Sequence, residues 1–442
     1  MESIGTETHG LRTVAGVTDG LHRTTTMTPQ DTTDDGTDDE TDGTGRTNRP
    51  KTRRRDFLAA TGAGVGAFGL AGCVGNLGGP GGGGGGGGGG DGPIKVGHLA
   101  PVQLDMGKGS MRSARLAVEE INSNGGIMDR DVELVEGDTQ ASPSQASNLV
   151  NEMVNQDNVS MISGTFASEV TLGILDRVGN TGVPLLDTGS ASPRITQEYP
   201  AQDYETFKNV FRVGPVNSNF QADLLADYGK FLSDTHGWNS FAVVVEDAEW
   251  TKPMTQRTGQ RMEAEHGLEV TMTQRIAPDT SDFAPVLDSI ANSGADAHIK
   301  AISHITGTAM LSSWGSNDYP FGEEGINVAS MSPQYWGDTN GGCLYETTSE
   351  TGAAGVAPIT EKTVPFAKQY EEKHAESRPT APMYMGFGTY DAMYVYKNAV
   401  EAAGTANYQE NLDTIVAELE GTDYTGTSGL PGGTVARGRI GR

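Results

Sequence analysis

VSMISGTFASEVTLGILDRVGNTGVPLLDTGSASPRIT, residues 159–196, contains two short apolar runs with a helical pattern between them. The runs at 159–163 and 183–186 are bounded by turn residues, which predicts two buried strands. Between them, residues 168–180 place apolar side chains at the spacing of an amphipathic helix. This strand–helix–strand order is typical of a parallel sheet in an α/β protein.

Each of these predicted strands is followed by a polar loop, at 164–168 and at 187–192. In an open parallel sheet such loops leave the carboxyl ends of the strands, where small ligands bind. We expect Ser168 to cap the helix, whose free N–H groups suit a carboxylate. The second loop offers backbone N–H groups and the hydroxyls of Ser190 and Ser192. Two ordinary strand-to-helix turns are the alternative interpretation, since the stretch contains no catalytic dyad.

The surrounding chain repeats this alternation of strand and helix. We predict a strand at 94–99, a helix at 110–124 that ends at a Gly-Gly pair, and a strand at 132–135. Ser142 and Pro143 are typical of the first positions of a further helix. The pattern indicates a doubly wound α/β fold.

Composition limits the partners of this protein. The 442 residues suffice for two domains, and 58 acidic against 31 basic side chains give a formal net charge of −27. Such a surface repels nucleic acid and anionic lipid, and it fits a protein from a salt-rich cell. There are two cysteines, Cys73 and Cys343, which excludes a disulfide scaffold.

The first 93 residues have the features of an export and anchoring segment. Residues 1–52 lack apolar periodicity, and we expect them to be disordered. In the segment 53–73, Arg54 and Arg55 precede a short, weakly apolar run, which is similar to a twin-arginine export signal. That run ends in Leu-Ala-Gly-Cys, which resembles a lipobox and implies lipid attachment to Cys73 at the cell surface. Residues 74–93, nearly all glycine, predict a flexible tether.

A family resemblance rests on two segments, ARLAVEEINSNGGI at 114–127 and the loops within 164–196. Both resemble the type I periplasmic binding proteins of ABC transporters, in particular the Leu/Ile/Val-binding proteins. Together with the export signal and the acidity, the resemblance points to a haloarchaeal lipoprotein. It implies two doubly wound parallel-sheet lobes joined by a three-crossing hinge. The expected boundaries are 94–213 plus 357–424 for the first lobe, 214–356 for the second, and 425–442 for an atypical tail.

The resemblance also implies a ligand site. Ser168 and the loop residues Gly189, Ser190 and Ala191 would hold the carboxylate and ammonium of an amino acid. Met106 stands where relatives place an aromatic lid, which keeps an apolar contact without a ring.

The second lobe supplies three further expected positions. Trp250 matches an aromatic residue that relatives set against the ligand, with packing under its own loop as the alternative. His304 replaces a tyrosine, and a structural role is its alternative. Gln334 stands near a carboxylate that relatives pair with the ammonium, and an amide cannot form that ion pair. Asp247, Glu249 or another acid compensates, or the ligand is not a standard amino acid.

The expected function is therefore an exported solute-binding lipoprotein that delivers branched-chain or related amino acids to an ABC permease. Binding of short amides or urea, and a ligand-sensing receptor domain of the same fold, are the alternatives. An enzyme is disfavoured because the sequence has no H-E-x-x-H or G-x-S-x-G motif. No cofactor or metal ion is expected.

Overall fold

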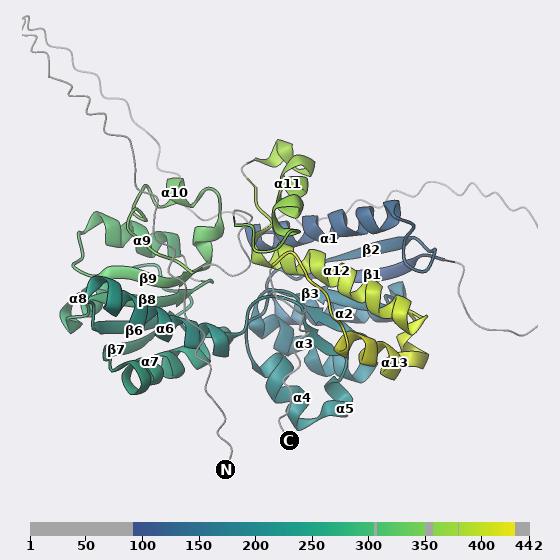
Figure 1. Cartoon of the computed structure of the whole chain (residues 1–442), viewed down its shortest axis with the longest axis horizontal. Coiled ribbons are helices and arrows are strands. Elements are labelled where there is room, and N and C mark those ends of the chain that lie inside the picture. The colour runs from purple at the N-terminus through teal and green to yellow at the C-terminus, as the bar shows by residue number, and fades with distance from the viewer. Residues whose placement is uncertain (1–91, 305–306, 350–356, 379, 429–442) are drawn as a thin grey trace, which may run out of the picture. The chain divides into compact units, whose positions relative to one another are not determined.

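The computed structural model describes residues 92–304, 307–349, 357–378 and 380–428, whose strands form two parallel sheets (Figure 1). The first lobe has the strand order β2-β1-β3-β4-β5. Its strands are β1 (Ile94–Ala100), β2 (Val132–Asp138), β3 (Met161–Gly164), β4 (Leu185–Asp187) and β5 (Val210–Arg212). The second lobe has the order β7-β6-β8-β9. Its strands are β6 (Ser240–Glu246), β7 (Glu269–Ile276), β8 (Ala297–Ile302) and β9 (Gly322–Asn327). These two sheets confirm the predicted α/β fold.

The helices of the first lobe come from both ends of the described chain. The N-terminal group is α1 (Asp105–Ser123), α2 (Pro143–Glu152), η1 (Met153–Asp157), α3 (Ser168–Thr181), η2 (Arg194–Glu198), α4 (Tyr199–Gln202) and α5 (Tyr204–Phe207). The C-terminal group is α11 (Thr363–Lys373), η5 (Ala375–Ser377), α12 (Met383–Ala403) and α13 (Tyr408–Glu420). Helix α12 packs along α1, so the C-terminal part of the chain returns to the first lobe (Figure 1).

In the second lobe, helices cover both faces of the sheet, so that each face has its own hydrophobic core. Its helices are α6 (Ser218–His236), η3 (Glu249–Thr251), α7 (Lys252–His266), α8 (Ala284–Ser293), α9 (Gly307–Ser316), η4 (Val328–Met331) and α10 (Tyr335–Asp338). In β6, Phe241, Val243 and Val245 pack in one core cluster with α6 and α7. Ala242 and Val244 pack in another with α8 and α9. Because successive side chains of a strand face opposite ways, a strand covered on both faces is apolar throughout.

Strand register determines where the loops emerge. Gly164 at the end of β3 pairs with Leu99 of β1 and with Asp187 of β4. The loops that follow these three strands therefore leave the same edge of the first sheet. The loops after β6, β8 and β9 likewise leave one edge of the second sheet, since these strands are parallel neighbours.

The helix expected at 110–124 begins earlier, at Asp105, so Met106 lies in its first turn and not in a loop. Gly107 and Gly109 disfavour a helix by propensity alone. Tight packing explains their presence, because a Cβ atom would lie 2.1 Å from the Pro101 carbonyl oxygen at Gly107 and 2.6 Å from the Pro382 carbonyl oxygen at Gly109. The packing contacts at these two glycines therefore outweigh their low helix propensity.

Several predictions fall outside the described residues. They are the leader at 1–52, the twin-arginine signal with Arg54 and Arg55, Cys73, most of the glycine tether and the tail after residue 428. The link from β5 to α6 is described, while the return at 350–356 and any later crossing are not. Among the described helices, none is long and apolar enough to cross a membrane.

Candidate functional site

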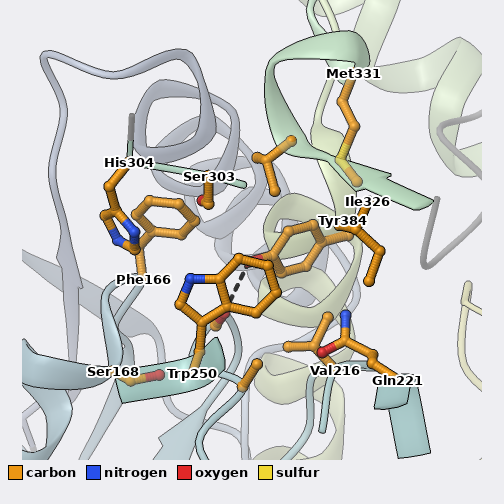
Figure 2. Close-up of a pocket in the computed structure, with 13 residues that line it drawn as sticks. Phe166, Ser168, Val216, Gln221, Trp250, Ser303, His304, Ile326, Met331 and Tyr384 are labelled. Carbon is orange, nitrogen blue, oxygen red and sulfur yellow. Dashed lines mark hydrogen bonds between the residues drawn. The ribbon is translucent and has the colours of Figure 1, made fainter. Parts of the chain in front are cut away.

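A pocket of about 390 Å³, including its opening to solvent, lies where the carboxyl-terminal edges of the two sheets meet. Both lobes contribute to its wall, as Figure 2 shows for ten labelled side chains. The lining residues are Phe166, Ser168, Gly189, Ala191, Val216, Gln221, Trp250, Ser303, His304, Ile326, Val328, Met331 and Tyr384. The wall is mainly apolar and aromatic with a few polar groups, the composition expected of a small-molecule site.

On the first lobe, Ser168 begins helix α3 and lines the pocket. The helix N-cap is Ala167, so the expectation that Ser168 caps α3 is wrong. Its Oγ instead accepts a hydrogen bond from the Ser192 N–H at 3.1 Å. A hydroxyl that accepts in this way retains its own O–H as a donor.

A buried ion pair holds the loop after β4. The Asp187 carboxylate lies 3.1 Å from Nη1 of Arg212, and both side chains are almost fully buried. Asp187 Oδ1 accepts the Ser190 N–H at 3.0 Å, and Arg212 Nη2 donates to the Ser192 carbonyl at 2.8 Å. Burial raises the pKa of Asp187 to about 6, although the charge of Arg212 acts in the opposite direction. The buried ion pair thus holds the backbone of the loop that carries Gly189 and Ala191.

On the second lobe, Glu246 organises the wall from behind. This buried residue ends β6, and its Oε2 accepts the backbone N–H groups of Ser303 at 2.8 Å and His304 at 2.7 Å. Its Oε1 accepts from His304 Nδ1 at 2.7 Å and from the indole N–H of Trp250. One carboxylate therefore positions both the backbone and two ring side chains of the pocket.

The same contacts make Glu246 and His304 an ion pair. Burial alone would raise the pKa of Glu246, but the hydrogen bonds from His304, Ser303 and Trp250 outweigh it and lower that pKa. Burial alone would lower the pKa of His304, but the hydrogen bond and charge of Glu246, with the charge of Glu169, raise it above its ordinary value. The pairing with Glu246 therefore favours the cationic form of the His304 ring in the pocket wall.

Two further residues complete the pocket. Tyr384, in the first turn of α12, donates its O–H to the Gly189 carbonyl at 2.8 Å, which Figure 2 shows as a dashed line. Gln221, from α6, is 8% exposed, and its Oε1 has no hydrogen-bond partner. Within the part of the chain that the structure describes, no cluster of three His, Cys, Asp or Glu residues could hold a metal ion.

Five residues singled out in the sequence come together in this wall: Ser168, Gly189, Ala191, Trp250 and His304. For Trp250, the expected place at the ligand site and the alternative of packing under its own loop both apply. The indole is 5% exposed and packed in a core cluster, and it also lines the pocket.

Three other sequence-derived positions are not among the lining residues. The Ser190 hydroxyl faces the Thr171 hydroxyl inside the lobe. Met106 is 3% exposed and packed in the core, because the early start of α1 turns it inward. Gln334 is exposed and immediately precedes the short helix α10. Its amide therefore does not line the pocket, where a partner for a solute's ammonium group would have to lie.

The acids suggested as substitutes for that partner also lie outside the wall. Asp247 pairs with Arg275 at 2.7 Å, and Glu249 pairs with Arg194 at 3.1 Å. Neither is a lining residue.

Sequence reasoning missed Glu246, Gln221 and the pocket role of Tyr384. Glu246 could have been found from the sequence, because it is an acidic residue at the carboxyl end of an otherwise apolar strand, the end at which ligands bind in a parallel sheet. Gln221 also had one, because it occupies the buried stripe of α6 with Ala222 and Leu225. Tyr384 lacked such a signal, because its aromatic neighbours along α12 form ordinary core.

The comparisons agree with this architecture. The family model described as periplasmic binding protein matches residues 93–441. A Leu/Ile/Val-binding protein homolog 7 of Brucella suis biovar 1 (strain 1330) is 27% identical over 210 residues, which cover 46% of this chain. The match spans about half of that relative's length, 50%.

Two solved structures share the fold. The branched-chain amino acid transporter substrate-binding protein LivJ from Streptococcus pneumoniae, in complex with isoleucine, superposes with a TM-score of 0.63. It is 18% identical, and the match covers 76% of this chain and 90% of that one. A solute-binding protein of an ABC transporter from R. palustris, in complex with benzoate, gives a TM-score of 0.61 at 16% identity, over 76% of this chain and 88% of that one.

Proposed function

Since the chain belongs to the periplasmic binding protein family, we propose that it captures a small solute between its lobes and delivers it to the permease of an ABC importer. The pocket carries this proposal, because two parallel sheets direct their carboxyl-terminal edges at one mixed cavity. Closure of the lobes would exclude water, so that a few hydrogen bonds suffice to fix the solute. The chain acts as a binding protein and not as an enzyme, as the named function of its relatives supports.

Branched-chain or related amino acids are the first solute class to consider. The Brucella relative is named for Leu, Ile and Val, and the LivJ structure holds isoleucine. Benzoate in the R. palustris protein extends the class to other small carboxylates. Short amides or urea are the alternative solutes, and a ligand-sensing receptor domain is the alternative role. Neighbouring permease and ATPase genes would favour transport over sensing.

The proposal includes a location at the cell surface. The paired Arg54 and Arg55 would direct export, and a lipid on Cys73 would anchor the protein. Replacing both arginines by lysine should leave the protein in the cytoplasm, and C73S should release it from membranes. Normal surface delivery of the double variant would contradict the export route. The acid excess supports a halophilic, haloarchaeal setting, in which stability should rise with KCl concentration.

A thermal-shift screen at high salt tests the binding function. The panel contains branched-chain amino acids, aromatic carboxylates, short amides and urea. A solute that binds only the folded state stabilises it by RT ln(1 + [L]/Kd), about 2.7 kcal/mol at a hundredfold excess over Kd. Absence of a shift with every solute in the panel would count against the proposed function.

A further inference from the structure

The lining of the pocket contains no acidic side chain among its described residues. The carboxylate of Glu246 lies behind the wall, where its two oxygens accept hydrogen bonds from Ser303, His304 and Trp250. A buried ammonium group requires an ion-pair partner or several acceptors to offset its lost hydration. The lining residues provide no such carboxylate for a solute's α-ammonium.

One backbone acceptor at the pocket already has a donor. The Gly189 carbonyl already accepts the Tyr384 O–H at 2.8 Å, and that tyrosine is 6% exposed. The polar side chains that line this side of the pocket carry donors, namely the Ser168 and Ser303 hydroxyls and the His304 ring, whose pKa is raised by Glu246. Donors that converge in this way suit a carboxylate, since charge-assisted hydrogen bonds are the stronger ones.

The other side of the pocket contains an unpartnered amide. Gln221 lies on the opposite side of Trp250 from Ser168 and His304 in Figure 2, beside Val216. Its side chain is nine-tenths buried, and Oε1 makes no hydrogen bond. A buried acceptor without a partner is unfavourable, and a hydrogen-bond donor on the solute would remove that penalty.

We infer that the solute is a small carboxylate without an ammonium group, whose apolar body carries a hydroxyl at the end that meets Gln221. The carboxylate is held at Ser168 and His304. A flat body lies among the rings of Phe166, Trp250 and Tyr384, so hydroxyaromatic acids are the best-matched class. This assignment rests on the proposed function and narrows its solute class.

Titration calorimetry with the full chain at high salt tests the inference through two matched pairs. Leucine and 4-methyl-2-oxopentanoate share a skeleton and differ in the ammonium, and we expect the oxo acid to bind at least tenfold more tightly. Benzoate and 4-hydroxybenzoate differ in the distal hydroxyl, and we expect the hydroxy acid to bind at least tenfold more tightly. A tenfold change corresponds to about 1.4 kcal/mol, within the range of one hydrogen bond.

A variant assigns the hydroxyl preference to its residue. Gln221→Met keeps the length of the side chain and removes the amide, so the ratio of the two affinities, at least tenfold in the native protein, should fall to about one. The empty variant should melt no lower than the native protein, because it loses an unpaired buried group. Phe220→Leu, at an exposed neighbour on α6, is the matched control and should leave both affinities unchanged.

Three outcomes would overturn the inference. Tighter binding of leucine than of its oxo acid would do so while leaving the proposed function intact. Tight binding of glycine betaine that is unaffected by Gln221→Met would point instead to an aromatic cage for a methylated ammonium. No binding of any solute would remove the proposed function together with the inference.

Discussion

Replacing Glu246 by glutamine should destabilise the protein strongly and weaken solute binding. The carboxylate accepts from two backbone N–H groups at Oε2, and from the His304 ring and the Trp250 indole at Oε1. An amide keeps one acceptor oxygen and turns an NH₂ group toward the other pair of donors. At least two hydrogen bonds to a buried charge are lost, each worth about 1.5–3 kcal/mol.

The expected loss in the free energy of unfolding is therefore about 3–6 kcal/mol, a large fraction of the ~5–15 kcal/mol typical of folded proteins. Urea titration at constant high KCl measures this free energy without changing the ionic strength. Asp247→Asn is the matched control, because it removes an exposed ion pair to Arg275 and should cost at most about 1 kcal/mol. The pKa of His304, followed by NMR, should fall in Glu246→Gln. A variant within about 1 kcal/mol of the native protein, with an unchanged His304 pKa, would refute the role of Glu246.

Three further predictions concern the solute, the pH and the fold. Ser168→Ala should weaken carboxylate binding by about tenfold in calorimetry through loss of the hydroxyl donor, whereas Ser190→Ala, outside the lining, should leave Kd unchanged. The raised pKa of His304 means that its charge is present at acid pH and is lost as pH rises through a folded-state value above the ordinary one, so carboxylate affinity should fall over that rise and the fall should disappear in His304→Asn. Gly164→Ala should cost about 3–5 kcal/mol in urea unfolding, because φ is +108° and a Cβ would lie 2.1 Å from the Leu99 carbonyl oxygen. Gly237→Ala, at φ +75° with nothing within 4 Å, should cost only about 1 kcal/mol.

The periodicity of the chain was sufficient to predict the α/β class, while the division into two lobes came from the family resemblance. The apolar run at 159–163 and the helical pattern at 168–180 correspond to β3 and α3. Ser142 caps α2 with Pro143 at its first position, as its local signal indicated. These elements are determined by local spacing and capping, which a single sequence displays.

The site was only partly predictable, because it depends on contacts between distant segments. Ser168 and His304 could be found because the family resemblance implies ligand contacts at these positions, in loops near the ends of strands. Met106 was misplaced because glycines that disfavour a helix in isolation permit close packing against the chain near Pro101 and Pro382. Tyr384 approaches Gly189 from 195 positions along the chain, and local periodicity contains no information about such a contact.

The arrangement around Glu246 explains how a strongly acidic protein can offer a site to an anion. With a formal net charge of −27, the surface repels a carboxylate at long range, although high salt confines that repulsion to a few ångströms. Inside the pocket the balance differs, because Glu246 is satisfied by its donors and raises the pKa of His304. The buried acid therefore does not oppose the solute, since it favours the cationic form of the ring that lines the pocket. Removing Glu246 would subtract a negative charge and yet weaken anion binding, an outcome opposite to that of simple charge counting.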